Sequence, residues 1–166
     1  MRRSWHASLS ILFALWQLPA LGAEAPWQTL GHSRYNLLFL PVYDVVLQVP
    51  SGNFHFPQSA PYTMDFEWKR DVDAEDILEI VRKQWKLQKL QWPAQWMERL
   101  QRVIPDVEKG DHLRVEVHSN HTATVSRNGK PMASIEDREL VLAFAGIWLS
   151  ERTGYPAMRK QLLGTH

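Results

Sequence analysis

The chain contains no cysteine among its 166 residues, so no disulfide can stabilise it. A chain of this length can bury enough apolar surface to fold as one domain without such cross-links. Lysine and arginine total 19 against 18 aspartates and glutamates, and no concentrated basic surface of the kind that binds nucleic acid is evident. Internal repeats, low-complexity tracts and long linkers are also missing. These absences favour a single globular domain that does not bind nucleic acid.

One long apolar run is present, at the N-terminus. Arg2 and Arg3 precede the apolar residues 8–18, and Pro19 with several small residues follows. This order is typical of a secretory signal peptide over residues 1–23, with an uncleaved N-terminal anchor as the alternative. The run is shorter than the roughly 20 apolar residues of a membrane-spanning helix, and no later segment reaches that length. The expected domain therefore covers residues 24–166.

Removal of residues 1–23 would leave 17 basic and 18 acidic residues, a net charge of −1. A cysteine-free exported protein fits the bacterial periplasm, which we predict as the location.

The pattern of apolar residues predicts strands, then two helices, then more strands, then helices again. Residues 62–69 alternate strictly between apolar and polar side chains, as a strand with one buried face does. Asp73 is the expected N-cap of a helix whose apolar stripe contains Ile77, Val81 and Trp85. Asn128-Gly129 is a strong signal for a tight hairpin between two later strands. This order indicates an α+β fold with an antiparallel sheet.

Several segments carry a resemblance to the chalcone isomerase-like family, and specifically to its short secreted bacterial members. The matching pieces are Gly31 with Arg34, and residues 37–47, 64–70, 107–113, 128–129, 142–149 and 158–164. The resemblance implies an open-faced sandwich, in which helices cover one face of a large antiparallel sheet. It also implies a hydrophobic ligand cleft between the two layers. The family includes plant flavonoid cyclases, fatty-acid binders and many members without demonstrated catalysis.

The resemblance implies a ligand site on the strand that begins near residue 34. In the cyclases and the fatty-acid binders, an arginine near the start of this strand holds the ligand's anionic oxygen or carboxylate, and Arg34 is the matching residue here. Guanidinium suits this task because it is always charged and offers paired donors. Residues 34, 36 and 38 of an extended strand share one face, so Asn36 and Leu38 are expected to join Arg34 in the site. The alternative is that Arg34 is a surface arginine in contact with water.

Leu38 argues against catalysis by this chain. It stands where the cyclases carry a threonine and the fatty-acid binders a tyrosine, so the hydroxyl is lost. Cyclisation needs polar groups that activate and stabilise a phenolate. Tyr43 is a further candidate for the ligand site, although the simpler interpretation is that it packs in the core while Asp44 meets solvent.

Other chemistry finds little support in the sequence. His112, His118 and His121 invite a metal site, but a solvated turn explains them better, because His112 and His118 lie about 20 Å apart along an extended strand. No catalytic triad, phosphate-binding loop or dinucleotide motif is evident, so no metal or cofactor is expected.

The leading hypothesis is an exported, non-catalytic domain that binds a small amphipathic molecule such as a fatty acid. A structural or protein-interaction module with a filled core is the first alternative. An isomerase or lyase acting on a hydrophobic substrate is the second. The sequence identifies no protein partner.

Overall fold

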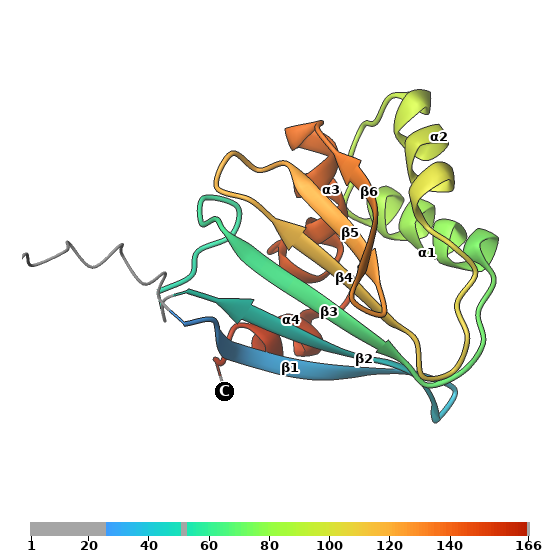
Figure 1. Ribbon diagram of the computed structural model, residues 1–166, viewed down its shortest axis with the longest axis horizontal. Coiled ribbons are helices and arrows are strands. Elements are labelled where there is room, and N and C mark those ends of the chain that lie inside the picture. The colour runs from blue at the N-terminus through green and yellow to red at the C-terminus, as the bar shows by residue number, and fades with distance from the viewer. Residues whose placement is uncertain (1–25, 51–52, 166) are drawn as a thin grey trace, which may run out of the picture.

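The computed structural model describes residues 26–50 and 53–165, and the predicted signal peptide lies outside them. Within this part of the chain, six strands form one antiparallel sheet in which spatial order follows chain order (Figure 1). The strands are β1 (Gln28–Leu37), β2 (Leu40–Val49), β3 (Tyr62–Trp68), β4 (His112–Val117), β5 (Ala123–Arg127) and β6 (Lys130–Ile135).

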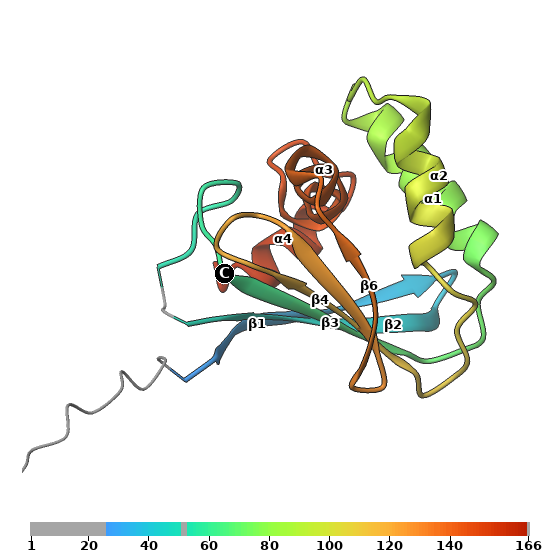
Figure 2. The ribbon, with the colours of Figure 1, turned by 45° about the horizontal axis from the view of Figure 1, so that its top comes forward.

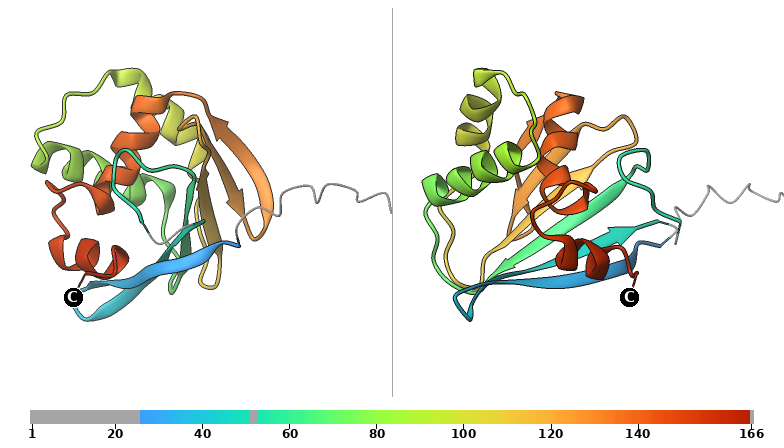
Figure 3. Two further views of the ribbon diagram at one scale, coloured as in Figure 1. Left: turned by 90° about the vertical axis from the view of Figure 1, so that its left-hand side faces the viewer. Right: turned by 180° about the vertical axis from the view of Figure 1, so that it is seen from behind.

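In the described ranges, four helices cover one face of this sheet and leave the other face open (Figures 2 and 3). They are α1 (Ala74–Leu87), α2 (Ala94–Val103), α3 (Arg138–Leu149) and α4 (Pro156–Leu162). The helices form two groups, with α1 beside α2 on one side and α3 followed by α4 on the other (Figure 2). The predicted α+β open-faced sandwich is thereby confirmed.

Strict alternation along the strands creates the two faces of the sheet. Val45 pairs with Phe66 across β2 and β3, and both side chains are buried beneath the helices. The intervening positions, such as Asp44 opposite Glu67, point to the open face and are only partly buried. Because successive strand residues point to opposite faces, the period of two in the sequence predicts this division.

The start of α1 differs from the expected cap. Asp73 holds the N-cap position, but its side chain makes no capping hydrogen bond. The first backbone N–H, of Ala74, instead donates to Oδ1 of Asp106 at 2.8 Å, a residue that follows α2. A carboxylate brought in by the fold thus satisfies a helix terminus that local sequence alone would assign to Asp73.

The turn between β1 and β2 is formed by Leu38 and Phe39, directly before the start of β2 at Leu40. Both residues have positive φ, 47° and 71°, which type I′ hairpin turns require and which Asn-Gly adopts most easily. The two residues are 83% and 98% exposed, so no packing within the described chain compensates for the strained backbone.

Replacing Leu38 by asparagine and Phe39 by glycine together is expected to raise the free energy of unfolding by about 1 kcal/mol, because both residues tolerate positive φ. Urea denaturation measures the change. Leu87→Asn is the matched control, since Leu87 is also exposed but lies in a helix. A double variant no more stable than the parent would contradict the strain argument.

Candidate functional site

An apolar cavity lies between the sheet and the helices, with a volume of about 70 Å³. Strands β2 to β6 supply its floor, and α1, α2 and α3 supply its walls. Its lining includes Val42, Tyr43, Trp68, Val81, Leu100 and Trp148. Among the described residues, no charged side chain lines the cavity.

Three of the lining residues bring polar atoms to this apolar space. Tyr43 and Trp68 are direct cross-strand partners, and their rings meet edge to face with centroids 5.3 Å apart. Nε1 of Trp148 donates a hydrogen bond of 2.9 Å to the hydroxyl of Tyr43. Burial raises the pKa of Tyr43, so the phenol stays protonated at any physiological pH.

Nε1 of Trp68 is buried and has no hydrogen-bond partner among the described residues. Leaving a buried donor unpaired costs on the order of 1–3 kcal/mol. One residue of the otherwise apolar lining therefore carries an unsatisfied N–H.

Arg34 lies on the opposite, open face of the sheet. It pairs in register with Asp44 of β2, and its guanidinium donates to both carboxylate oxygens at 2.6 and 2.9 Å. The hydrogen bond from Arg34 lowers the pKa of Asp44 to about 2, with Lys69 contributing. Since strand alternation turns residue 34 away from the helices, the structure does not bring this guanidinium to the cavity.

Asn36 and Leu38, two other predicted site residues, also lie away from the cavity. Asn36 is exposed on the open face with Arg34, whereas Leu38 has left the strand and projects from the hairpin turn. The expectation that residues 34, 36 and 38 share a face therefore fails at Leu38, because the chain reverses there. Tyr43 alone of the predicted set lines the cavity.

The sequence did contain a signal for Trp68, which was not singled out as a site residue. Its place in the alternating segment 62–69 puts it on the same face as Met64 and Phe66, under the helices. Its pairing with Tyr43 depends on strand register, which alternation alone does not give.

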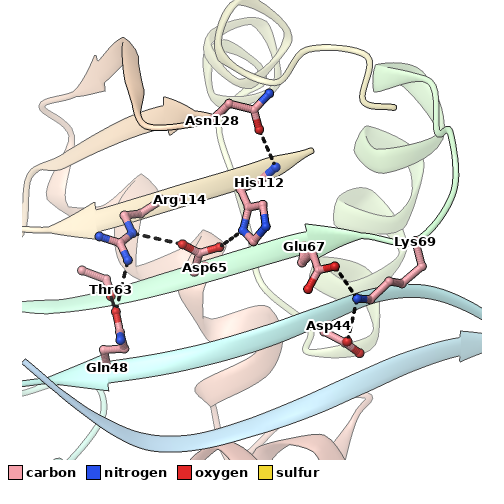
Figure 4. A network of polar contacts seen from close by, with 9 residues as sticks. All are labelled: Asp44, Gln48, Thr63, Asp65, Glu67, Lys69, His112, Arg114 and Asn128. Atoms are coloured by element: carbon pink, nitrogen blue, oxygen red, sulfur yellow. Dashed lines mark hydrogen bonds and ion pairs between the residues drawn. The ribbon is translucent and has the colours of Figure 1, made fainter. Parts of the chain in front are cut away.

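The open face carries a network of polar side chains (Figure 4). Asp65 accepts one hydrogen bond from Arg114 at 3.1 Å and lies 2.9 Å from Nδ1 of His112, while Lys69 bridges Asp44 and Glu67. Such exposed pairs contribute little to stability. They nevertheless make this face unsuited to an apolar ligand.

The three histidines considered for a metal have separate partners. His112 faces Asp65, His118 contacts the hydroxyl of Thr124, and His121 lies near the carbonyl of Pro57. Across residues 26–50 and 53–165, no group of three or more histidine or acidic side chains is placed to hold a metal ion. In the same ranges, no helix has both the length and the apolar character needed to cross a bilayer.

Comparison with known proteins agrees with this architecture. The chain is 24% identical over 147 residues to an uncharacterized protein of Haemophilus influenzae, covering 84% of this chain and 69% of that protein. Its fold is similar to that of a fatty-acid binding protein of Arabidopsis thaliana, with a TM-score of 0.62 at 14% sequence identity, over 88% of this chain and 90% of that one. The family model described as chalcone isomerase-like matches residues 39–164. With most of its length matched by that model, the chain belongs to the chalcone isomerase-like family.

Proposed function

We propose that this protein is a binding domain for a small, largely apolar molecule, which it holds in the cavity between sheet and helices. The observation that carries the proposal is the apolar lining of that cavity, with polar atoms confined to Tyr43, Trp68 and Trp148. Ligand pockets are typically built this way, with mostly apolar walls and a few placed polar groups. The shared fold with a fatty-acid binding protein supports a hydrophobic ligand class.

A fatty acid is the more specific ligand that we propose, and the size of the cavity limits the length of its chain. Pockets for drug-sized ligands measure about 300–1,000 Å³, several times the volume of about 70 Å³ seen here. A short alkyl group fits as the structure stands. A long acyl chain needs more space than this cavity provides.

The small volume is also the observation that favours the alternative of a structural or interaction module with a nearly filled core. The binding domain and the interaction module can be told apart with a variant whose larger side chain fills the cavity. Such a variant weakens ligand binding only if the cavity is the binding site. An isomerase is the weaker candidate, since we find no acid–base pair in the lining of the cavity. Export to the periplasm remains part of the proposal and depends on the signal-like pattern of residues 1–23.

Replacing Val81 by phenylalanine is expected to weaken ligand binding at least tenfold, because the added ring would occupy the cavity. Titration of delipidated protein with alkyl ligands of increasing length, followed by calorimetry, measures this. Val46→Phe is the matched control, since Val46 lies on the open face and is only partly buried. Val103→Ala, which enlarges the cavity, should shift the preference towards longer chains. Equal affinities for the parent protein and its three variants would show that the cavity is not the binding site.

A further inference from the structure

Resting on the proposed function, we propose that the cavity selects ligands with an uncharged hydrogen-bond acceptor, such as a ketone, an ester or an un-ionised carboxylic acid. The indole N–H of Trp68 and the hydroxyl of Tyr43 would both donate to that acceptor. Three observations lead to this ligand class.

Trp68 stands apart from the other deeply buried tryptophans of the described chain. Nε1 of Trp85 donates to the carbonyl of Ala143 at 2.9 Å, and Nε1 of Trp96 donates to Asp137 at 3.1 Å. Trp148 donates to Tyr43. Trp68 is only 6% exposed, yet its Nε1 has no such partner, and it lines the cavity. A ligand acceptor would satisfy the group that the fold leaves unpaired.

Tyr43 supplies a second donor next to the first. Its oxygen accepts the N–H of Trp148, and among residues 26–50 and 53–165 its hydroxyl donates no hydrogen bond, so its own proton is left to donate. Tyr43 and Trp68 face each other across β2 and β3 on the cavity side. Two donors on neighbouring strands can converge on one oxygen, because a carbonyl oxygen has two lone pairs.

The absence of charge in the lining decides between neutral and anionic ligands. An ion buried without a partner costs far more than a neutral polar group, so a carboxylate would bind poorly here. Arg34, the cation expected to hold a carboxylate, is on the other face and already paired with Asp44. An acid ligand should therefore enter in its protonated form.

Tyr62 offers an internal comparison. Its hydroxyl is also buried without a partner, but Tyr62 is not among the residues that line the cavity. An unpaired donor therefore indicates a ligand contact only at Trp68, where open space adjoins the residue.

The test uses 2-pentanone, pentane and pentanoate as matched ligands of the full-length folded protein. Titrations are followed through the indole ¹H–¹⁵N resonances, with Trp68→Phe assigning the signal of Trp68. We expect 2-pentanone to bind about threefold to tenfold more tightly than pentane and to move the Trp68 indole proton downfield, as one or two net hydrogen bonds would do. Pentanoate should bind at pH 4 and lose that binding at pH 7, above the usual carboxyl pKa of about 4–5.

Tyr43→Phe keeps the ring and removes the donor. It is expected to reduce the affinity for 2-pentanone about threefold to tenfold and to leave the affinity for pentane unchanged. If this variant does not fold, the shift of the Trp68 indole proton in the parent protein decides the matter alone. Equal binding of ketone and hydrocarbon, with the Trp68 signal unmoved, would overturn the donor assignment and leave the proposed function intact. No binding of any of the three ligands would instead overturn the proposed function.

Discussion

Replacing Gly31 by alanine is expected to lower the free energy of unfolding by about 3 kcal/mol, because there is no room for a side chain at this position. A Cβ at residue 31 would lie 2.5 Å from the carbonyl oxygen of Leu162 and closer still to that of Gln161. Both are backbone atoms of α4, so the clash cannot be relieved by rotating a flexible side chain.

The consequence would extend beyond the local clash. β1 is an edge strand, and α4 packs against it through the buried Leu162 and through a hydrogen bond of 2.5 Å from Ser33 to Gln161. Figure 3 shows α4 lying next to β1 at this edge of the sheet. Displacing α4 would uncover an edge strand, which natural proteins generally protect.

Gly146→Ala is the matched control for the glycine prediction. A Cβ at residue 146, inside α3, would meet its nearest neighbour at 3.6 Å, which is ordinary contact. Alanine favours helix over glycine by about 1 kcal/mol, so this variant should be at least as stable as the parent. Urea denaturation of both variants makes the comparison, and equal stability of Gly31→Ala and the parent would contradict the packing of α4 on β1.

Replacing Asp111 by alanine is expected to cost about 3 kcal/mol, because one carboxylate joins three segments. Asp111 accepts hydrogen bonds from the backbone N–H of Glu108 at 2.8 Å, from Arg127 at 2.5 Å and from Nδ2 of Asn128 at 2.8 Å. These contacts hold the start of β4 against the β5–β6 hairpin. Their loss would leave three buried or partly buried donors unpaired.

The same contacts predict how stability depends on pH. The backbone hydrogen bond from Glu108, followed by those from Arg127 and Asn128, lowers the pKa of Asp111 from 3.8 to about 2. A carboxylate with a lowered pKa stabilises the fold fully above its ordinary pKa and loses that contribution as pH falls through its value in the folded state. The parent protein should therefore lose stability between about pH 4 and pH 2, and Asp111→Ala should lose less over this window.

Asp44→Ala is the control for this second prediction. The pKa of Asp44 is also lowered to about 2, mainly by Arg34, but its side chain is 26% exposed against 10% for Asp111. An exposed ion pair contributes about 0–1 kcal/mol, so the cost should be well below that of Asp111→Ala. Acid titrations of both variants, followed by circular dichroism, make the comparison. If Asp44→Ala and Asp111→Ala lost similar stability, the hydrogen bonds of Asp111 would not be what holds β4 against the β5–β6 hairpin.

Much of the fold followed from periodicity. Alternation at residues 62–69 correctly assigned β3 and its buried face, and the stripe of Val81 and Trp85 correctly assigned α1. The β1–β2 turn was not predicted, because Leu38 and Phe39 are unusual residues for positive φ and no turn signal marks them. This turn is also the reason why Leu38 does not continue the face of Arg34 and Asn36.

The candidate site was harder to predict because it depends on pairing and not on residue type. Arg34 looked like a ligand residue in a hydrophobic segment, but its direct partner in the β1–β2 register is Asp44 on the open face. Trp68 looked like any other core tryptophan. Its importance appears only when the hydrogen bonds of the other buried indoles are known.

If an apolar ligand can occupy the space beneath the helices, xenon should enter the same space, because it binds in dry apolar cavities without needing a polar group. Methyl and indole resonances of the protein would be recorded under increasing xenon pressure. We predict saturable shifts at Val81, Leu100 and Trp148, which line the cavity from three different helices. Shifts confined to the exposed Leu38–Phe39 turn, or no shifts at all, would mean that the protein has no such binding space.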